Sequence, residues 1–423
     1  MYLPSKYLLT CCLLLLFCGT PTDQAPGQNP ELPNDTIRVL LFDEEPARDL
    51  SIGARDAAIR LSWDEGSEQL NPEASNITIA PASPGANALN FRLNGKARQT
   101  SALIVSSGRR GLIQIKRSGS PNRYYDGKLQ IYVDSLASDS TAWLRLINYT
   151  PLEAYVGGVI AGEMDFKDPS ALKAQAVISR TYALWSMQNY RDKPYDLTDH
   201  ISNQVFPGII TYKPRFAEAA RTSHAEVLTW SGKLIFAPFS STCGGYTSNN
   251  EGVWNGEPLP YLRTVDDHKA CADSPHYRWN FRIERNELKN SLSNAYGLSA
   301  GALRIDSTNS QGRALKIALG NTGQNSFAAQ KVMDANEFRL FINNHFGIRS
   351  LRSSWFDIVN QGDAILFRGK GMGHGVGLCQ WGALDLAEAG WNYRQILKFY
   401  YKGVKVVDYH SLDHSLRALP LAK

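Results

Sequence analysis

The sequence predicts a mixed α+β protein with a β-rich N-terminal part, a helical core with mixed strands, and an inserted αβ unit. Three patterns support this: short β-like runs up to about residue 147, helically spaced apolar residues from Ser170, and a second helix–strand–helix series near residues 281–355. With 43% hydrophobic and 20% charged residues, the composition is that of a globular protein and not a disordered one. The net charge of +5 is mild and gives no reason to expect nucleic acid as a partner.

Residues 1–18 have the pattern of an export signal. A single lysine precedes an apolar run from Tyr7 to Cys18, and this run is too short to span a membrane as a helix. Residues 19–36 are rich in Pro, Gly, Asn and Asp and predict a flexible linker. We expect an exported protein, released by simple cleavage or lipidated at Cys18. Only the second outcome would anchor it to a membrane.

Residues 37–147 predict a β-rich region. IRVLLF begins a strand, and further β runs follow between Gly, Asn and Ser clusters: ITIA, LNFRL, ALIVSS, LIQIK, LQIYVD and WLRLIN. The Asp126–Gly127 step lies between two of the strand-like runs and predicts a hairpin.

Residues 148–280 predict the helical core. Asp168 is suited to cap a helix with Pro169 at its first position, and helical spacing of apolar residues continues to about Gln188. A shorter helix in RFAEAARTSHAEV precedes a strand pair that turns at Ser231–Gly232.

Residues 281–355 predict the inserted αβ unit, and residues 356–423 a Gly-rich segment with a C-terminal helix that packs on the core. In the insert, ERNELKNSLSNAYG is an amphipathic helix and GRALKIALG a strand. A second helix, DANEFRLFINNHFG, ends at Gly347.

Glu163 is the candidate acid. In VIAGEMDF it stands among apolar and small residues, and such surroundings raise the pKa of a carboxyl and keep its proton available near neutral pH. Asp165, two residues on, is more typical of the approach to a helix than of a second catalytic carboxylate.

Two further segments carry polar side chains in unusual settings. The Gly-rich stretch 369–383 lacks the GK[ST] ending of a phosphate loop. Its glycines permit tight turns, or they display His374 and Gln380 to a polymer. The stretch FSSTCGGYTSNNEGVW (239–254) mixes hydroxyls, amides and aromatics, which suits sugar binding and also suits an ordinary loop.

Three cysteines follow the leader: Cys243, Cys271 and Cys379. In an oxidising compartment one pair would form a disulfide and leave one thiol over. We favour Cys243 with Cys271, and the alternative is three buried free thiols.

Several motifs, in order, resemble the SpoIID/LytB family of bacterial cell-wall proteins. They are RYYDGKLQIYV, LEAYVGGVIAGEM, ALKAQAVISRTYAL, QVFPGI, STCGGYTSNNEGVW with PYLRTV, and GMGHGVGLCQWGALDLA. The resemblance covers residues 120–403 and is strongest over 148–266, whereas residues 37–119 match only loosely.

The resemblance implies a peptidoglycan lytic transglycosylase of the cell envelope or periplasm. Such enzymes cut the β-1,4 bond after N-acetylmuramic acid in glycan strands and need no cofactor. The catalytic glutamate of the family corresponds to Glu163 and an important arginine to Arg180. An arginine paired with Glu163 would weaken the acid, so we assign Arg180 to substrate binding and orientation. Further binding candidates are Ser241, Thr242, Tyr246, His374, Gln380 and Trp381.

Two alternatives to this activity remain open. Other family members are amidase enhancers, which modify a partner hydrolase without cutting glycan themselves. A hydrolase using water would need a second carboxylate, whereas a lytic transglycosylase needs one carboxyl, because the muramic acid C6 hydroxyl attacks its own anomeric carbon.

We predict no metal site. A sporulation homologue has a Cys/His metal site just before its Q-V-Y-like motif, but here YDLTDHISNQVF offers His200 and no cysteine. Cys243 and Cys271 could join His268 or His276 as ligands. In an exported protein we favour the disulfide over this alternative.

Overall fold

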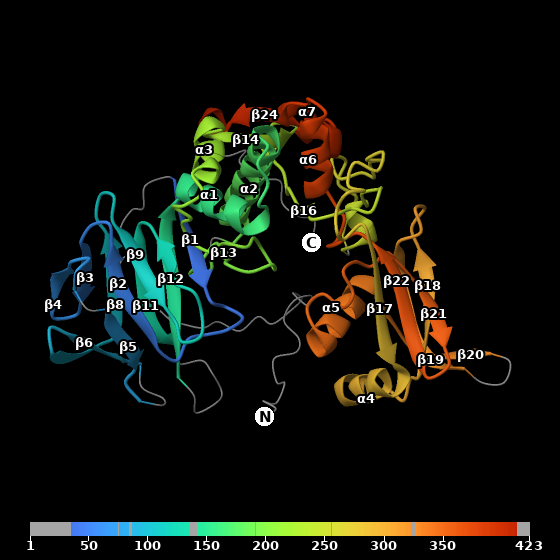
Figure 1. Cartoon of the computed structure of the whole chain (residues 1–423), viewed down its shortest axis with the longest axis horizontal. Coiled ribbons are helices and arrows are strands. Elements are labelled where there is room, and N and C mark those ends of the chain that lie inside the picture. Colours follow the sequence, from blue (N-terminus) through green and yellow to red (C-terminus); the bar gives the residue numbers. More distant parts are fainter. Residues whose placement is uncertain are drawn as a thin grey trace. The chain divides into compact units, whose positions relative to one another are not determined.

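The computed structural model describes residues 35–412, except residues 75, 84–86, 135–141, 191, 255 and 323–325. The predicted leader, its Cys18 and nearly all of the predicted linker lie outside the described residues. The chain divides at residue 35, and the unit from Thr36 onward is described here. It contains helices and many strands, so the predicted α+β class is confirmed (Figure 1). Among the described residues, no helix is long and apolar enough to cross a bilayer.

Two antiparallel-rich sheets form the N-terminal part, which is blue to cyan in Figure 1. One has the strand order β13-β1-β12-β11-β8-β3-β4 and the other β10-β9-β2-β5-β6-β7. In β11 every second side chain is buried, as expected for strands that cover a core with one face. The strands are β1 (Thr36–Leu41), β2 (Leu50–Arg55), β3 (Ile59–Trp63), β4 (Gly66–Leu70), β5 (Ile77–Pro81), β6 (Leu89–Leu93), β7 (Lys96–Thr100), β8 (Ala102–Ser107), β9 (Leu112–Lys116), β10 (Arg123–Tyr125), β11 (Lys128–Asp134), β12 (Trp143–Pro151) and β13 (Leu197–Thr198).

The hairpin predicted at Asp126–Gly127 is wrong. The strand before this step, β10, pairs with β9 in one sheet, whereas β11 pairs with β8 and β12 in the other. The step therefore carries the chain from one sheet to the next. Gly127 has φ +83, and a Cβ there would lie 2.1 Å from the Tyr149 carbonyl oxygen of β12. The glycine is needed for this close approach as well as for its backbone angle.

The helical core begins with α1 (Leu152–Glu163) and α2 (Pro169–Asn189), followed by α3 (Arg215–Thr222). The predicted cap of α2 is confirmed, because the Asp168 carboxylate accepts hydrogen bonds from the backbone N–H groups of Ser170 (2.7 Å) and Ala171 (3.1 Å). Sequence reasoning missed α1. Its residues are buried on most sides and include three glycines, so no helical period of apolar residues marks it.

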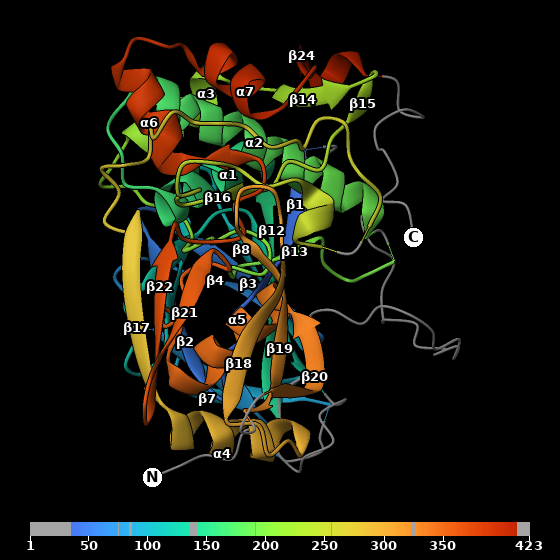
Figure 2. The same cartoon turned by 90° about the vertical axis from the view of Figure 1, so that its right-hand side faces the viewer.

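The Gly-rich segment returns to this core. β16 (Phe239–Ser240) pairs in parallel with β23 (Leu378–Cys379), and β14 (Glu226–Trp230) pairs with both β15 (Lys233–Leu234) and β24 (Lys405–Asp408). One buried cluster accordingly contains residues from α2, from 228–271 and from 376–404. Figure 2 shows α6 (Gln380–Glu388) crossing beside α2. The remaining elements are η1 (Asn250–Gly252), α7 (Tyr393–Tyr400) and η2 (Tyr409–Ser411).

The inserted unit has a hydrophobic cluster of its own, drawn from residues 279–367. It holds two three-stranded sheets, β17-β22-β21 and β18-β19-β20. β22 pairs with β17, and β21 pairs with β22, so residues 356–370 belong to the sheet of this unit and not to the final segment to which the sequence assigned them. The elements are β17 (Arg278–Glu284), α4 (Arg285–Tyr296), β18 (Ala302–Thr308), β19 (Ala314–Thr322), β20 (Phe327–Asp334), α5 (Ala335–Phe346), β21 (Phe356–Gln361) and β22 (Ala364–Lys370).

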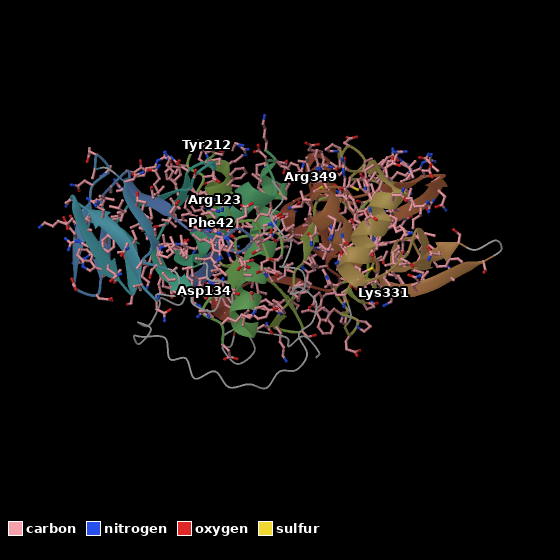
Figure 3. The ribbon with its side chains drawn as sticks, turned by 90° about the horizontal axis from the view of Figure 1, so that it is seen from below. Phe42, Arg123, Asp134, Tyr212, Lys331 and Arg349 are labelled. Atoms are coloured by element: carbon pink, nitrogen blue, oxygen red, sulfur yellow. The ribbon has the colours of Figure 1, made fainter. Side chains whose placement is uncertain are left out.

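A buried carboxylate fastens the segment after β13 to the end of β1. Asp199 accepts a hydrogen bond from the Phe42 N–H at 3.0 Å and pairs with the Arg123 guanidinium at 2.9 Å. The Arg123 guanidinium also lies over the Phe42 ring, 4.8 Å from its centre, and the two residues are adjacent in Figure 3. The Asp199 carbonyl accepts from the Phe206 N–H at 3.1 Å. These contacts fix residues 199–206, which reach the candidate site.

Candidate active site

Glu163 is the last residue of α1, and its carboxyl is held by two neutral donors. The Val205 N–H donates to Glu163 Oε1 at 2.7 Å. The Gln380 side-chain amide donates a second hydrogen bond to the same carboxyl. Glu163 itself is only partly buried, so a bound molecule can reach it. The EM motif and the Gly-rich segment, more than 200 residues apart in sequence, therefore meet at one carboxyl.

Burial raises the pKa of Glu163 to about 7, although the hydrogen bonds from Val205 and Gln380 act in the opposite direction. The C-terminal end of a helix carries partial negative charge, which also disfavours an ionised carboxylate there. Among the described residues, no charged group contributes to this shift. Glu163 can therefore carry a proton near neutral pH and give it up again, as a general acid and base must.

A line of buried amides fixes the Gln380 side chain. Gln380 Nε2 donates to Gln175 Oε1 at 3.3 Å, and Gln175 Nε2 donates to Ser179 Oγ at 3.0 Å. All three residues are buried. Buried amides need a hydrogen-bond partner for each polar group. The hydrogen bonds from Gln175 and Ser179 of α2 therefore set the orientation of the Gln380 side chain toward Glu163.

Glycines in α1 let the loop 204–208 approach Glu163. A Cβ on Gly162 would lie 2.4 Å from the Val205 carbonyl oxygen, and one on Gly158 would lie 2.5 Å from the Phe206 ring. The loop is also tied to α1 by the Tyr155 hydroxyl, which donates to Gln204 Oε1 at 3.1 Å. The close approach at Gly158 and Gly162 explains the GGVIAG pattern before Glu163. Small residues there leave room for the loop backbone that supplies the Val205 N–H donor.

Aromatic rings lie next to Gln380 in the sequence and beside His374 in the Gly-rich segment. Phe166 and Trp381 meet edge to face with ring centres 5.3 Å apart, and both are partly buried. A second series runs from Phe236 to Trp254 (5.7 Å) and from Trp254 to His374 (4.9 Å). Partly exposed rings of this kind offer flat apolar faces, which suit the faces of sugar rings.

The structure separates the predicted binding residues into groups. Gln380 and Trp381 lie at the Glu163 site. Thr242 is fully buried and its hydroxyl bonds to Ser274 Oγ at 2.7 Å, so it cannot meet a ligand as predicted. The Ser241 backbone helps to position Trp381, because its carbonyl accepts a hydrogen bond from the Trp381 N–H at 3.1 Å. Tyr246 is 39% exposed, and its backbone forms an isolated antiparallel β-bridge with Asp266.

His374 is a neutral residue that contacts Trp254. Its Nδ1 accepts a hydrogen bond from the Val376 N–H at 3.0 Å. Burial, with the nearby cations Arg339 and Arg313, lowers the pKa of His374 to about 3. The imidazole is therefore uncharged at neutral pH and holds the Gly-rich backbone beside the Trp254 ring.

The prediction that Arg180 binds substrate is not supported by its position. Arg180 is fully buried and forms a two-pronged ion pair with Glu153 at 2.6 and 2.7 Å. Glu153 lies ten residues before Glu163 on α1, about 15 Å along the helix axis. The guanidinium also donates to the carbonyls of Ala220 and Glu226. Arg180 thus joins α1, α2, α3 and β14, and its full burial keeps it away from a bound ligand.

The predicted disulfide is absent. Cys243, Cys271 and Cys379 are free and buried, and the sulfurs of Cys243 and Cys271 are 3.6 Å apart. Neither of the histidines considered as metal ligands joins them. The His268 side chain is 80% exposed, and His276 Nδ1 contacts the Arg352 guanidinium at 3.0 Å.

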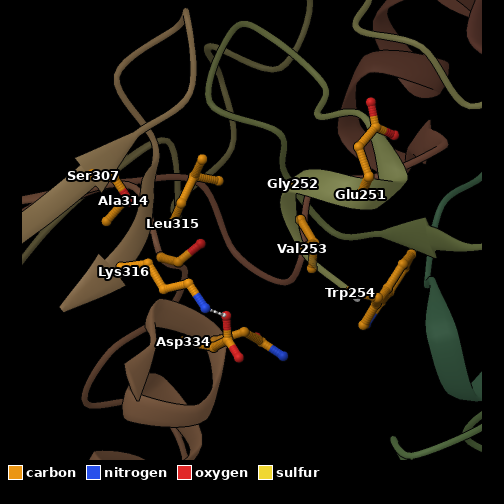
Figure 4. A pocket seen from close by; sticks show the side chains of 11 residues that line it. Glu251, Gly252, Val253, Trp254, Ser307, Ala314, Leu315, Lys316 and Asp334 are labelled. Carbon is orange, nitrogen blue, oxygen red and sulfur yellow. Dashed lines mark ion pairs between the residues drawn. The ribbon is translucent and has the colours of Figure 1, made fainter. Parts of the chain in front are cut away.

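A pocket lies between η1 and the inserted unit (Figure 4). Residues 251–254 line one side, and β19 with the start of α5 lines the other. An ion pair of 3.0 Å joins Lys316 to Asp334 on this second side. Trp254 belongs both to the pocket and to the aromatic series that ends at His374, whereas Glu163 does not line it.

Sequence reasoning missed the donor at Val205, because a backbone N–H has no side-chain signature. The QVFPGI motif, which contains Val205, was the available signal.

A mixed α+β fold in which the partly buried Glu163 carboxyl lies between the EM helix and the Gly-rich segment defines a class of protein, and comparison with known proteins identifies that class. A family model described as stage II sporulation protein matches residues 140–230. A stage II sporulation protein D of Bacillus amyloliquefaciens is 30% identical over 275 residues, covering 60% of this chain and 74% of the relative. This chain belongs to the stage II sporulation protein D (SpoIID/LytB) family.

Two other relatives differ in how they are named. An uncharacterized protein of Brachyspira hyodysenteriae is 34% identical over 272 residues, covering 63% of this chain and 70% of the relative. An amidase enhancer of Bacillus subtilis is 27% identical over 294 residues, covering 60% of this chain and 40% of the relative.

Proposed function

We propose that this protein is a peptidoglycan lytic transglycosylase. It cleaves the β-1,4 bond between N-acetylmuramic acid and N-acetylglucosamine and leaves a 1,6-anhydro end. The observation that carries the proposal is the Glu163 carboxyl, whose pKa is raised to about 7 and whose hydrogen-bond donors are neutral. Such a group is suited to protonate a leaving oxygen near neutral pH.

The reaction uses one carboxyl twice. Protonated Glu163 gives its hydrogen to the glycosidic oxygen as the bond from the muramic acid C1 to that oxygen breaks. The carboxylate then takes the proton of the C6 hydroxyl while O6 forms a bond to C1. Atoms and charge balance without water, and Glu163 returns to its protonated state.

The surroundings of Glu163 favour this route over hydrolysis. An enzyme that activates water needs a second carboxylate near the first. Among the described residues, no other carboxylate contributes to the raised pKa of Glu163. Asp165 is exposed and engaged with Lys213 at 2.6 Å and with Arg215, so it is not directed at the same substrate.

The neighbouring rings suggest how a glycan strand would be held. Trp381 follows Gln380 directly and contacts Phe166, so a sugar stacked on this pair would lie beside the Glu163 carboxyl. We place the protein in the cell envelope with glycan strands as its partner, because the N-terminal sequence is typical of export. Lipidation at Cys18 would attach the protein to the membrane within the envelope.

A second candidate is a cell-wall-binding amidase enhancer without activity of its own. It is favoured by the relative of that name in Bacillus subtilis. Its partner would be a cell-wall amidase, and in this case Glu163 would serve no proton transfer.

The test is incubation of the purified protein with intact and peptide-stripped glycan strands, followed by mass analysis of the new ends. Lytic transglycosylation gives anhydro ends, whereas hydrolysis gives ends heavier by one water. Glu163→Gln should lose this activity, and the matched control Asp165→Asn should keep it. Full activity of Glu163→Gln would remove Glu163 from the mechanism. If neither substrate is cut but a wall amidase is stimulated, the enhancer role replaces the enzyme.

A further inference from the structure

Three buried thiols and one buried carboxyl lie close together next to the backbone that carries Gln380. They come from three separate segments: Cys243 after β16, Asp267 and Cys271 from the loop before β17, and Cys379 at the end of β23, directly before α6. Their sulfur and oxygen atoms all lie within 4.8 Å of one another. Each cysteine is fully buried, and Asp267 is 1% exposed.

The spacing of these atoms suits a metal ion. Two sulfurs bound to one tetrahedral Zn²⁺ lie about 3.8 Å apart when each Zn–S bond is about 2.3 Å. The sulfurs of Cys243 and Cys271 are 3.6 Å apart. Cys243 Sγ is also 2.8 Å from Asp267 Oδ2, so the carboxylate is directed at the sulfurs. A disulfide would occupy two of the sulfurs and would leave a buried thiol and a buried carboxylate without a role.

Backbone donors orient these groups as expected for metal ligands. Cys379 Sγ accepts from the N–H groups of Cys243 (3.2 Å) and Gly382 (3.4 Å). Asp267 Oδ1 accepts from the Lys269 N–H at 3.1 Å, which leaves Oδ2 for the cluster. Hydrogen bonds of this kind hold thiolate and carboxylate ligands in place around a metal.

A buried cation lies beside the cluster. Arg313 is 1% exposed, and its Nη2 donates to the Cys243 carbonyl at 3.1 Å. Its Nη1 is buried without a hydrogen-bond partner, and no carboxylate among the described residues forms an ion pair with it. A buried unpaired guanidinium is costly. A centre of three thiolates and one carboxylate around a divalent ion stays negative, and it would balance this charge.

We propose that Cys243, Asp267, Cys271 and Cys379 form a structural Zn²⁺ site. Three thiolates and a carboxylate complete a tetrahedron, and the burial of all four leaves no open position for a substrate. Thiolates favour Zn²⁺ over Mg²⁺ or Ca²⁺. The ion fastens the STCGG loop to the start of α6. Because Gln380 follows Cys379 directly, the site also anchors the backbone from which Gln380 reaches Glu163.

The first experiment measures metal in the full-length protein, produced with Zn²⁺ supplied. Elemental analysis should find about one zinc per chain. Replacing zinc by Co²⁺ should give the intense near-ultraviolet sulfur-to-cobalt absorption of a thiolate site. Cys379→Ser and Asp267→Asn should each lower metal affinity at least tenfold. The control variants His268→Ala and His276→Ala should retain the metal, because neither side chain joins the cluster.

The cobalt spectrum of the unaltered protein keeps the test decisive if a cysteine variant fails to fold. Two results would overturn the proposal. One is metal-free protein whose mass is lower by two hydrogens, which indicates a disulfide. The other is metal-free, folded protein with three titratable thiols. None of these measurements depends on whether glycan is cleaved, so the metal site and the proposed enzyme can fail separately.

Discussion

The proton on Glu163 links the proposed activity to stability. Its pKa is raised from 4.5 to about 7 in the folded protein. A carboxyl with a raised folded pKa favours folding most below the unfolded pKa, and this contribution is lost as the pH rises through 4.5 to about 7. At higher pH the wild-type protein pays the cost of a poorly solvated carboxylate.

Glu163→Gln should therefore be the more stable protein at pH 8 and not at pH 4. The expected gain is about 1–2 kcal/mol, kept small because part of the side chain reaches solvent. Urea unfolding of both proteins at the two pH values measures the difference. An equal difference at both would mean that the pKa of Glu163 is not raised.

Arg180 carries a structural role that substitution can expose. Arg180→Met should destabilise the protein by about 3–5 kcal/mol, because Glu153 and two carbonyls lose their buried partner. The double variant Arg180→Met/Glu153→Met should recover part of this loss, since no charge is left unpaired.

Lys173→Met on the same helix is the control and should change stability by less than about 0.5 kcal/mol. Denaturant unfolding measures all three variants. If Arg180→Met unfolded like the wild type but raised the KM for glycan, the substrate-binding role would be restored.

At the scale of elements, the approach of α1 to the loop 204–208 depends on Gly162. An added Cβ would lie 2.4 Å from the Val205 carbonyl oxygen, so Gly162→Ala must push away the loop that supplies the Val205 donor. We expect a loss of about 1–3 kcal/mol in stability. Cleavage should fall with it, even at temperatures where the variant is folded.

Gly157→Ala is the matched control in the same helix. Its Cβ would meet nothing closer than 3.5 Å, an ordinary contact, and alanine favours the helix by up to about 1 kcal/mol. Thermal unfolding and the product assay compare the two variants. Equal behaviour would show that the loop does not depend on Gly162.

Elements with a local signature were predicted well. The capped start of α2, the end of α5 at Gly347 and the turn at Ser231–Gly232 all follow from short-range backbone preferences. Features set by residues far apart in sequence were not predicted. The helix α1 is buried on most sides and shows no helical period, and the strands on either side of Gly127 pair with other strands and not with each other. Arg180 pairs with Glu153 and not with a substrate.

At the scale of the whole molecule, the inserted unit has its ends side by side. Arg278 and Lys370 are partners across β17 and β22, and the unit has a buried cluster of its own. We expect a fragment of residues 277–371 to unfold in one cooperative transition. Phe338→Ala, at a fully buried position, should abolish or greatly weaken it, whereas Val332→Ala, at a 48% exposed position, should not. Circular dichroism with denaturant measures this, and a fragment without any transition would contradict it.

The neutral environment of Glu163 has one more consequence. Dissolved ions weaken attractions between exposed charges, but they screen hydrogen bonds from neutral groups and the interactions of buried groups much less. Since the groups that contact this carboxyl, among the residues described, are a backbone N–H and an amide, its proton affinity should hardly respond to the ionic strength of the medium. An organism whose surroundings change from fresh to saline would keep the same acid strength at this position.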